Sequence, residues 1–226
     1  MMIALELLSV FAVMLGVKWG ADRLGVLGAG SIAMWCGVLV ATWLMRRRSG
    51  TWRGLGLTWP AGWRAWRSTL GWAAVALVSI FAAMALVIEP VTAALGLDTP
   101  ASAADRFQPL MGHPLRLAVY LVVVVWIGAA LGEELQMRGF VLDRLAELLG
   151  RGKLGWGTAV AAQAVIFGAL HAYQGLHGMI ATAVIGAILA LVYLASGRRL
   201  LPVVIGHGVM NTIILTALYL NGGVVG

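Results

Sequence analysis

Long apolar runs constrain this chain more than any other feature of its sequence. Seven of them predict helices, near residues 2–17, 24–45, 68–89, 115–135, 156–172, 178–196 and 200–219. Most of these runs approach the length of about 20 residues that a helix needs to cross the hydrocarbon core of a bilayer. The chain is 61% hydrophobic and only 11% charged, whereas a soluble domain is nearer about half apolar and a quarter charged. We therefore predict an all-α fold, a polytopic membrane helix bundle with about seven transmembrane helices.

Two further segments have the composition of helices that lie in the membrane interface. In 139–150, "GFVLDRLAELLG", Asp143, Glu147 and Arg151 form one stripe and the apolar residues form another, which predicts an amphipathic helix that ends at Gly150. Counted as a span, it would be an eighth helix. Segment 58–67, "TWPAGWRAWR", combines tryptophan with arginine, and both residue types favour the headgroup region. Its proline suits a first helical turn, so we predict a second interfacial helix there.

The net charge of +7 and the pI of about 10.5 would indicate nucleic-acid binding in a soluble protein. Here the basic residues flank apolar runs, so they are interpreted as topology signals and contacts to anionic lipid, with no nucleic-acid partner. If the 46–67 connection is cytoplasmic, twelve Lys and Arg residues lie on that side and four on the other. This bias predicts a cytoplasmic N-terminus and an exterior C-terminus.

A few polar residues interrupt the apolar runs of the second half of the chain. A charged side chain at the centre of a membrane helix costs about 2.5–3.5 kcal/mol on insertion scales, so such residues are functional candidates. Glu134 and Arg138 are four residues apart, which predicts a pair on one helix face. Glu133 points about 100° away from Glu134, and we expect its partners to be His171 and His207 from other helices.

Three spaced motifs contain these residues, in a fixed order on successive apolar helices. They are E-E-x-x-x-R at 133–138, F-x-x-x-H at 167–171 and H-x-x-x-N at 207–211. Together they resemble the CAAX protease and bacteriocin-processing (CPBP, or ABI) family of intramembrane proteases. The resemblance covers about 115–216. It predicts three regions: N-terminal transmembrane helices with an exterior loop over 1–114, a CPBP-like catalytic helix core over 115–216, and a C-terminal tail over 217–226.

The resemblance implies a peptidase that cuts peptide or protein substrates at the membrane. It implies that Glu133 and His171 handle the attacking water. His207 and Asn211 would bind the developing oxyanion or, in another account, a metal. Glu134 and Arg138 would be a supporting pair. The resemblance also implies contact with the lipid bilayer, and we expect the protein to lie in a bacterial inner (cytoplasmic) membrane.

The chemistry of these residue types supports that expectation. Amide hydrolysis needs a base for water, donors for the oxyanion and an acid for the leaving amine, and Glu, His and Asn supply all three. Two histidines and a carboxylate are also a catalytic zinc set, so Glu133, His171 and His207 are the predicted ligands if the enzyme uses a divalent metal such as Zn. The HExxH and HxxEH motifs are absent, and a single cysteine excludes a cysteine-rich metal site. Metal-dependent and glutamate-type mechanisms therefore stay open.

Two other functions would use the same buried polar residues. A proton-coupled transporter relays protons through Glu and His, but it is expected to show internal repeats or paired broken helices, and we find neither. A non-catalytic immunity or scaffolding protein would retain the fold, yet inactive family members often lose a catalytic residue, and none is missing here. His171 or Asn211 taken alone could simply bond neighbouring helices. The combined motifs favour the peptidase.

Overall fold

The computed structural model describes residues 2–26, 28–97 and 105–222. Over these residues the chain is helical and contains no strand, which confirms the predicted fold class. Seven helices in the described part are long and apolar enough to cross a membrane, as the apolar runs predict. They are α1 (Met2–Arg23), α2 (Ala29–Arg47), a helix over Gly62–Ala94, a helix over Pro114–Leu148, α8 (Lys153–Leu170), a helix over Ala172–Ala195 and α10 (Leu200–Leu220). The helix Gly62–Ala94 consists of α3 (Gly62–Ala83), the π-helical turn Met84–Ile88 and α4 (Glu89–Ala94). The helix Ala172–Ala195 consists of the 3-10 turn Ala172–Gln174 and α9 (Gly175–Ala195).

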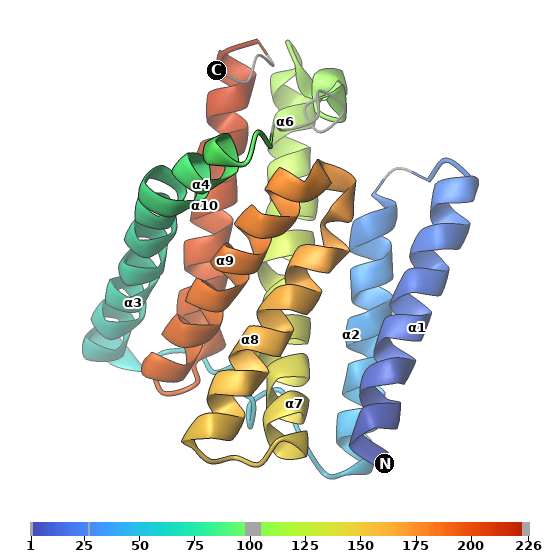
Figure 1. Cartoon of the computed structure of the whole chain (residues 1–226), viewed down its shortest axis with the longest axis vertical. Helices are drawn as coiled ribbons and strands as arrows, with labels where there is room; N and C mark the ends of the chain where they lie inside the picture. Colours follow the sequence, from blue (N-terminus) through green and yellow to red (C-terminus); the bar gives the residue numbers. More distant parts are fainter. Residues whose placement is uncertain (1, 27, 98–104, 223–226) are drawn as a thin grey trace.

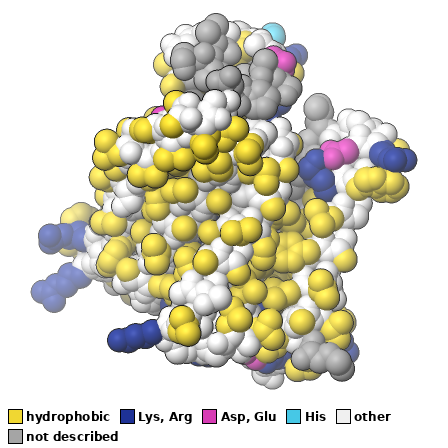
Figure 2. Space-filling view, viewed as in Figure 1, with side chains coloured by type: hydrophobic (Ala, Val, Ile, Leu, Met, Phe, Trp, Pro, Cys, Tyr) yellow, Lys and Arg dark blue, Asp and Glu magenta, His cyan; other side chains and the backbone are white. Residues whose placement is uncertain are grey.

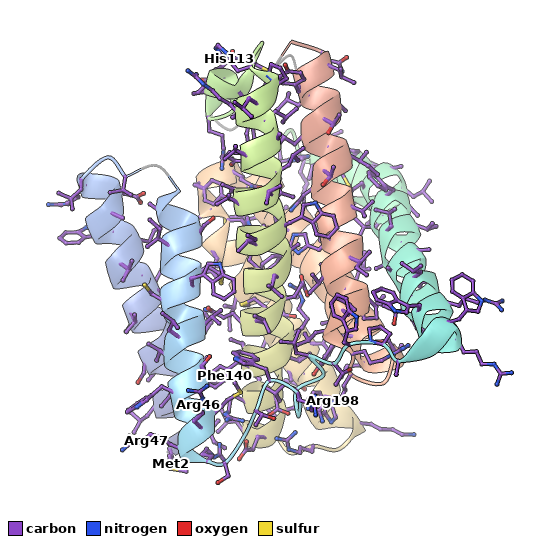
Figure 3. The ribbon with its side chains drawn as sticks, turned by 180° about the vertical axis from the view of Figure 1, so that it is seen from behind. Met2, Arg46, Arg47, His113, Phe140 and Arg198 are labelled. Carbon is purple, nitrogen blue, oxygen red and sulfur yellow. The ribbon has the colours of Figure 1, made fainter. Side chains whose placement is uncertain are left out.

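The helices form a bundle whose two ends are chemically different (Figure 1). The helix Pro114–Leu148 runs through the middle, with α8 and α9 on one side of it, α1 with α2 at one flank and α3 with α10 at the other. The N-terminus lies at the end where α3, α8 and α10 begin, which we call the basal end, and α10 finishes at the opposite end. Met2, Arg46, Arg47 and Arg198 lie near the basal end and His113 near the other (Figure 3). Apolar side chains cover much of the face between the two ends (Figure 2).

The central helix departs most from the sequence expectation. It begins as α6 (Pro114–Tyr120), is wound as a π-helix over Leu121–Glu133 and Leu135–Val141, and ends as α7 (Leu142–Leu148). A π-helix is bonded from i to i+5, so neighbouring side chains diverge by less than the 100° of an α-helix. The prediction of a separate interfacial helix over 139–150 is wrong, because this segment continues the span to Leu148. Its buried polar side chains, Asp143 and Arg144, contact other protein groups, whereas Glu147 is only half-buried.

Those polar side chains form a cluster of seven charged residues at the basal end, which we call the basal ion cluster. It consists of three acidic and four basic residues, Glu6, Asp143, Glu147, Arg48, Arg144, Arg151 and Arg198. Asp143, which is 4% exposed, accepts hydrogen bonds from Arg151 and Arg198 at 2.8 Å each. Arg144 Nε donates to Glu6 of α1 at 2.6 Å. The cluster ties α1, the end of α2, α7 and the α9–α10 connection together.

The second predicted interfacial helix is also absent as a separate element among the described residues. α3 begins at Gly62, after Pro60, because the backbone of Ala61 is extended. Gly62 itself has φ +79°, in the left-handed region, so a regular first turn cannot include Pro60. Trp59 and Trp63 are nevertheless 77% and 71% exposed, consistent with side chains placed for the headgroup region.

Glycines allow the helices to approach closely. A Cβ atom on Gly168 of α8 would lie 2.5 Å from the backbone oxygen of Met179 in α9. A Cβ on Gly206 would lie 2.9 Å from Ala76 of α3. These contacts hold α8 against α9 and α10 against α3, and so position the motif residues that α8 and α10 carry. The proposed division at 114 and 216 stays a prediction, and residues 98–104 of the exterior loop and 223–226 of the tail lie outside the described residues.

Candidate active site

A buried ion pair lies at the centre of the site. Glu134 and Arg138 are both fully buried, and Arg138 Nη1 donates to Glu134 Oε1 at 2.9 Å, which confirms the predicted pairing. Arg138 Nη2 donates to the backbone carbonyl of Gly186 in α9 at 3.1 Å. The guanidinium therefore has partners on two helices, as a buried charge requires.

His207 of α10 makes the second contact to the Glu134 carboxylate. Its Nδ1 lies 2.8 Å from Glu134 Oε1, and the ring is 4% exposed. An ionised carboxylate only accepts hydrogen bonds, so Nδ1 carries the hydrogen. The expectation that His207 partners Glu133 is therefore wrong. Glu134 lies between the two π-helical stretches, and its carboxylate contacts both His207 of α10 and Arg138 of its own helix.

Phe167 of α8 connects this ion pair to the other histidine. The Arg138 guanidinium carbon lies 4.7 Å from the centroid of the Phe167 ring, and that ring lies 4.7 Å from the ring of His171. His171 follows the last residue of α8, and its Nδ1 lies 2.8 Å from the carbonyl oxygen of Phe167. A carbonyl only accepts, so this Nδ1 also carries a hydrogen, and the neutral ring has its lone pair on Nε2.

Glu133 and Asn211 lie beside this arrangement with unused polar capacity. Both side chains are half-buried, and neither has a hydrogen-bond partner in the part of the chain that the structure describes. Glu133 attracts Arg138 electrostatically, and Asn211 follows His207 by one turn on α10. The contacts thus join His207, Glu134, Arg138, Phe167 and His171 directly, whereas Glu133 and Asn211 are held near them by their own helices.

Two contributors to the site are not predicted by the sequence. Phe167 belongs to a motif, but its role as the contact between Arg138 and His171 depends on the fold. Gly186 contributes a backbone carbonyl, and a Cβ there would lie 3.0 Å from the Phe167 ring. A backbone acceptor has no side-chain signal, so only the packing of α9 could reveal it.

The proposed metal ligands do not form a metal site in this arrangement. Among the described residues, no group of three or more His, Cys, Asp and Glu side chains lies close enough together to hold a metal ion. One nitrogen of each histidine is already directed at an oxygen, His171 at a carbonyl and His207 at Glu134. We therefore derive no step through a metal, and metal dependence stays a prediction.

Comparison with known protein families locates the same region of the chain. Residues 115–213, a little under half of the chain, match the family model described as Type II CAAX prenyl endopeptidase Rce1-like. Searches of curated proteins and of solved structures found no match. The matched segment contains all three motifs and every residue of the arrangement described above. The family that the motifs predict is thereby confirmed: residues 115–213 form an Rce1-like domain, consistent with a CPBP family intramembrane protease.

Proposed function

We propose that the chain is an intramembrane endopeptidase that hydrolyses peptide bonds of membrane-associated peptides or proteins by means of an activated water. One observation carries this proposal: both motif histidines are held through Nδ1, His171 by a carbonyl and His207 by a carboxylate. Such contacts fix the tautomer and the ring orientation and leave Nε2 of both rings for substrate or water. A histidine that served only to join helices would have no need of this matched arrangement.

Glu133 and His171 activate the water in this scheme. The ionised Glu133 carboxylate and the Nε2 lone pair of His171 are both acceptors, so a water between them can lose a proton as it attacks the scissile carbonyl. Glu133 suits this role because its carboxylate has no hydrogen bond to another described side chain. The proton then passes to the leaving amine.

His207 and Asn211 stabilise the oxyanion. When His207 is protonated, its Nδ1–H stays on Glu134 and its Nε2–H is a donor, and the Asn211 amide one turn away is a second donor. Donors that are already positioned cost no reorganisation as charge develops on the carbonyl oxygen, and loss of one such donor typically lowers kcat by about 10²–10³. Glu134 and Arg138 act by holding His207 in place.

The description of the matching family, a CAAX prenyl endopeptidase, favours a lipidated peptide as the substrate. We would test cleavage with two fluorogenic peptides of one sequence, one with a prenylated cysteine and one with the free thiol. Purified protein in detergent is expected to cleave the prenylated peptide, and His171→Ala is expected to lower kcat at least about a hundredfold through loss of an acid–base group.

His177→Ala is the matched control, because His177 is a histidine near the start of α9 that belongs to none of the three motifs, and its Nε2 is 3.5 Å from Glu89. It should cleave like the unmodified protein. Equal loss in both variants, or full activity in His171→Ala, would contradict the assignment. Metal analysis of the active protein with a chelator titration tests whether a divalent metal such as Zn takes part.

A further inference from the structure

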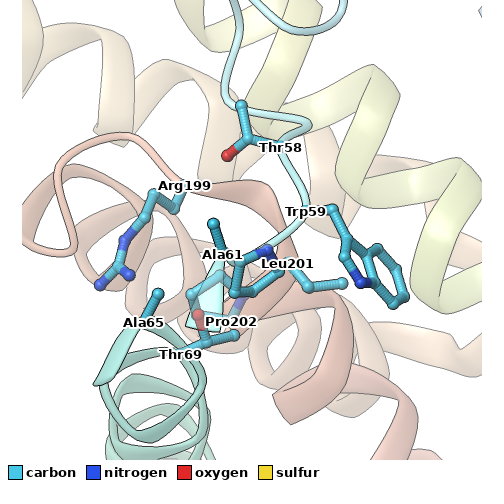
Figure 4. Close-up of a pocket in the computed structure, with 9 residues that line it drawn as sticks. Thr58, Trp59, Ala61, Ala65, Thr69, Arg199, Leu201 and Pro202 are labelled. Atoms are coloured by element: carbon cyan, nitrogen blue, oxygen red, sulfur yellow. The ribbon is translucent and has the colours of Figure 1, made fainter. Parts of the chain in front are cut away.

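A cavity at the basal end lies outside the motif residues. It has a volume of about 220 Å³ and lies between the connection that precedes α3, the first turns of α3 and the start of α10. Figure 4 shows Thr58, Trp59, Thr69 and Arg199 placed around it, contributed by segments far apart in the sequence. None of the described residues that line it is acidic. The electrostatics of this cavity therefore favour an anion.

Two helices begin at the cavity. α3 has Ala61 and α10 has Arg199 at the N-cap, and neither residue caps its helix through a hydrogen bond from its side chain. The first N–H groups of a helix have no partner within the helix, and the helix dipole places partial positive charge there. At α10 the Leu200 N–H already donates to the Gly56 carbonyl at 3.0 Å and Pro202 has no N–H, so the hydrogen-bond donors come mainly from α3. An anion there gains both hydrogen bonds and a favourable field.

A buried hydroxyl gives an independent sign of a ligand. Thr69 lines the cavity, is 1% exposed, and its hydroxyl has no hydrogen-bond partner within the described residues. In the described part of the chain, five other helical threonines bond the carbonyl four residues earlier, whereas the half-buried Thr216 has no such bond; the five are Thr42, Thr92, Thr158, Thr182 and Thr212. Thr69 does not use this alternative. Buried hydroxyls are normally bonded, so this one is available to a group inside the cavity.

Arg199 supplies the charge at the rim of the cavity. Its Nε donates to the carbonyl of Ser196 at 2.7 Å and its Nη2 donates to Ser68 Oγ at 3.0 Å. These bonds orient the half-buried guanidinium, and the rest of its five N–H donors stay available. Arginine binds phosphate with a rigid fork of donors, whereas a surface lysine offers only a point charge.

A second, shallower hollow lies along the outside of α3. It is lined by Ser68, Gly71, Trp72 and Val75 and has a volume of about 330 Å³. Ser68 accepts a hydrogen bond from Arg199, which lines the first cavity, so a lining residue of each hollow is in contact with one of the other. From Ser68 to Val75 the second hollow follows the helix for about 10 Å toward the middle of the span. An apolar groove that leads from a phosphate site into the hydrocarbon region has the shape of an acyl-chain site.

We propose that the cavity binds the phosphate of an anionic phospholipid headgroup, held by Arg199, Thr69 and the N-terminus of α3, with an acyl chain along the hollow lined by Gly71, Trp72 and Val75. A phospholipid headgroup and free inorganic phosphate would both present a phosphate anion to these residues. The groove favours the lipid, because free phosphate would leave it unused. This lipid site shares none of its described lining residues with the three motifs, so its test is independent of the peptidase chemistry.

The test uses the purified full chain after removal of bound lipid, with binding followed by native mass spectrometry. The probes are dihexanoyl phosphatidylglycerol, dihexanoyl phosphatidylcholine and inorganic phosphate. Both lipids carry the phosphate, but the choline of the zwitterionic lipid would place a second cation beside Arg199. We therefore expect the anionic lipid to bind at least about tenfold more tightly, since like-charge juxtaposition costs more than the ~1.4 kcal/mol of one factor of ten. Arg199→Gln and Thr69→Val should each weaken that binding by about tenfold.

Arg67→Gln is the matched control, because Arg67 is an exposed arginine of α3, the helix that carries Thr69, and does not line the cavity. It should change binding less than about twofold. Thr69→Val removes a hydroxyl that has no protein partner, so it should leave the melting temperature of the lipid-free chain unchanged or raised, and this separates lost binding from misfolding. No preference for the anionic lipid, an equal effect of Arg67→Gln, or inorganic phosphate that binds as tightly as the lipid would each overturn the proposal.

Discussion

At the scale of single residues, the two adjacent glutamates carry charge into the membrane for different reasons. Glu134 is fully buried and its Oε1 accepts from both Arg138 and His207. Glu133 is half-buried and has no such hydrogen bonds among the described side chains. Hydrogen bonds hold the Glu134 carboxylate in one orientation, whereas the Glu133 carboxylate, which lacks them within the described part of the chain, is available to take a proton from water. We therefore assign a positioning role to Glu134 and a chemical role to Glu133.

Substitution of each glutamate by glutamine separates these roles. Glu133→Gln should leave a folded protein whose peptide cleavage falls at least about a hundredfold, the low end for losing a general base. Glu134→Gln should lower the melting temperature in detergent, because it leaves the buried Arg138 without a counter-ion, and removing one partner of a buried pair costs about 3–5 kcal/mol. It should also reduce cleavage, since His207 loses its acceptor. A stable but inactive Glu134→Gln beside a fully active Glu133→Gln would reverse the assignment.

At the scale of secondary structure elements, the basal ion cluster explains why α7 continues a membrane-spanning helix with polar residues. Outside the spans, the hydrogen bond with Asp143 raises the pKa of the Arg151 guanidinium, and the hydrogen bond with Glu147 raises the pKa of Arg48. These residues join the α7–α8 loop and the end of α2 to α7. The stripe that indicates an amphipathic helix is thus a contact surface for four other segments.

Asp143→Asn tests the contribution of this cluster to stability. The change removes the charge that Arg144, Arg151 and Arg198 share. Breaking a buried pair costs about 3–5 kcal/mol, and the partial exposure of these arginines reduces that cost, so we expect the melting temperature in detergent to fall by at least about 5 °C. Asp22→Asn, which breaks the exposed pair of Lys18 and Asp22, should shift it by less than about 2 °C. Equal shifts would show that the cluster contributes no more than a surface pair.

At the scale of the whole molecule, seven candidate spans place the two termini at opposite ends of the bundle (Figure 1). The basal end collects the connections rich in Lys and Arg, including Arg46, Arg47 and Arg198 (Figure 3). The family and the apolar helices indicate an integral membrane protein. Because basic loops are retained in the cytoplasm, we propose that the basal end and the N-terminus are cytoplasmic, in a bacterial inner membrane.

Cysteine labelling tests this orientation. In a Cys36→Ala background, Ser49→Cys places a thiol on the exposed α2–α3 connection, and Asn221→Cys places one at the end of α10. An impermeant thiol reagent applied to intact bacterial cells should label residue 221 and leave residue 49 unlabelled until the membrane is opened. Labelling of residue 49 in intact cells would show that the basic loops do not set the orientation.

Much of the architecture could be predicted from the sequence because membrane insertion depends on local composition. Each apolar run needs only its own length and hydropathy to become a span, so the seven helices agree with the runs that predict them. The pair of Glu134 with Arg138 was equally predictable, because a spacing of four residues places both on one face within a single helix. The separate interfacial helix at 139–150 is predicted wrongly, because an amphipathic stripe does not show whether water or protein meets its polar face. The one at 58–67 is predicted wrongly because the extended Ala61 and the left-handed Gly62 delay the start of α3.

The sequence by itself therefore determined the fold class, the number of spans and the motif residues, all of which follow from order and spacing along the chain. Only the tertiary structure decided which glutamate meets His207, that Phe167 lies between Arg138 and His171, and that the Gly186 carbonyl accepts from Arg138. These contacts join different helices, and their geometry depends on the π winding of the central helix and on close crossings at glycine. Such features arise from packing between elements, because a helix carries no local signal of which neighbour its faces will meet.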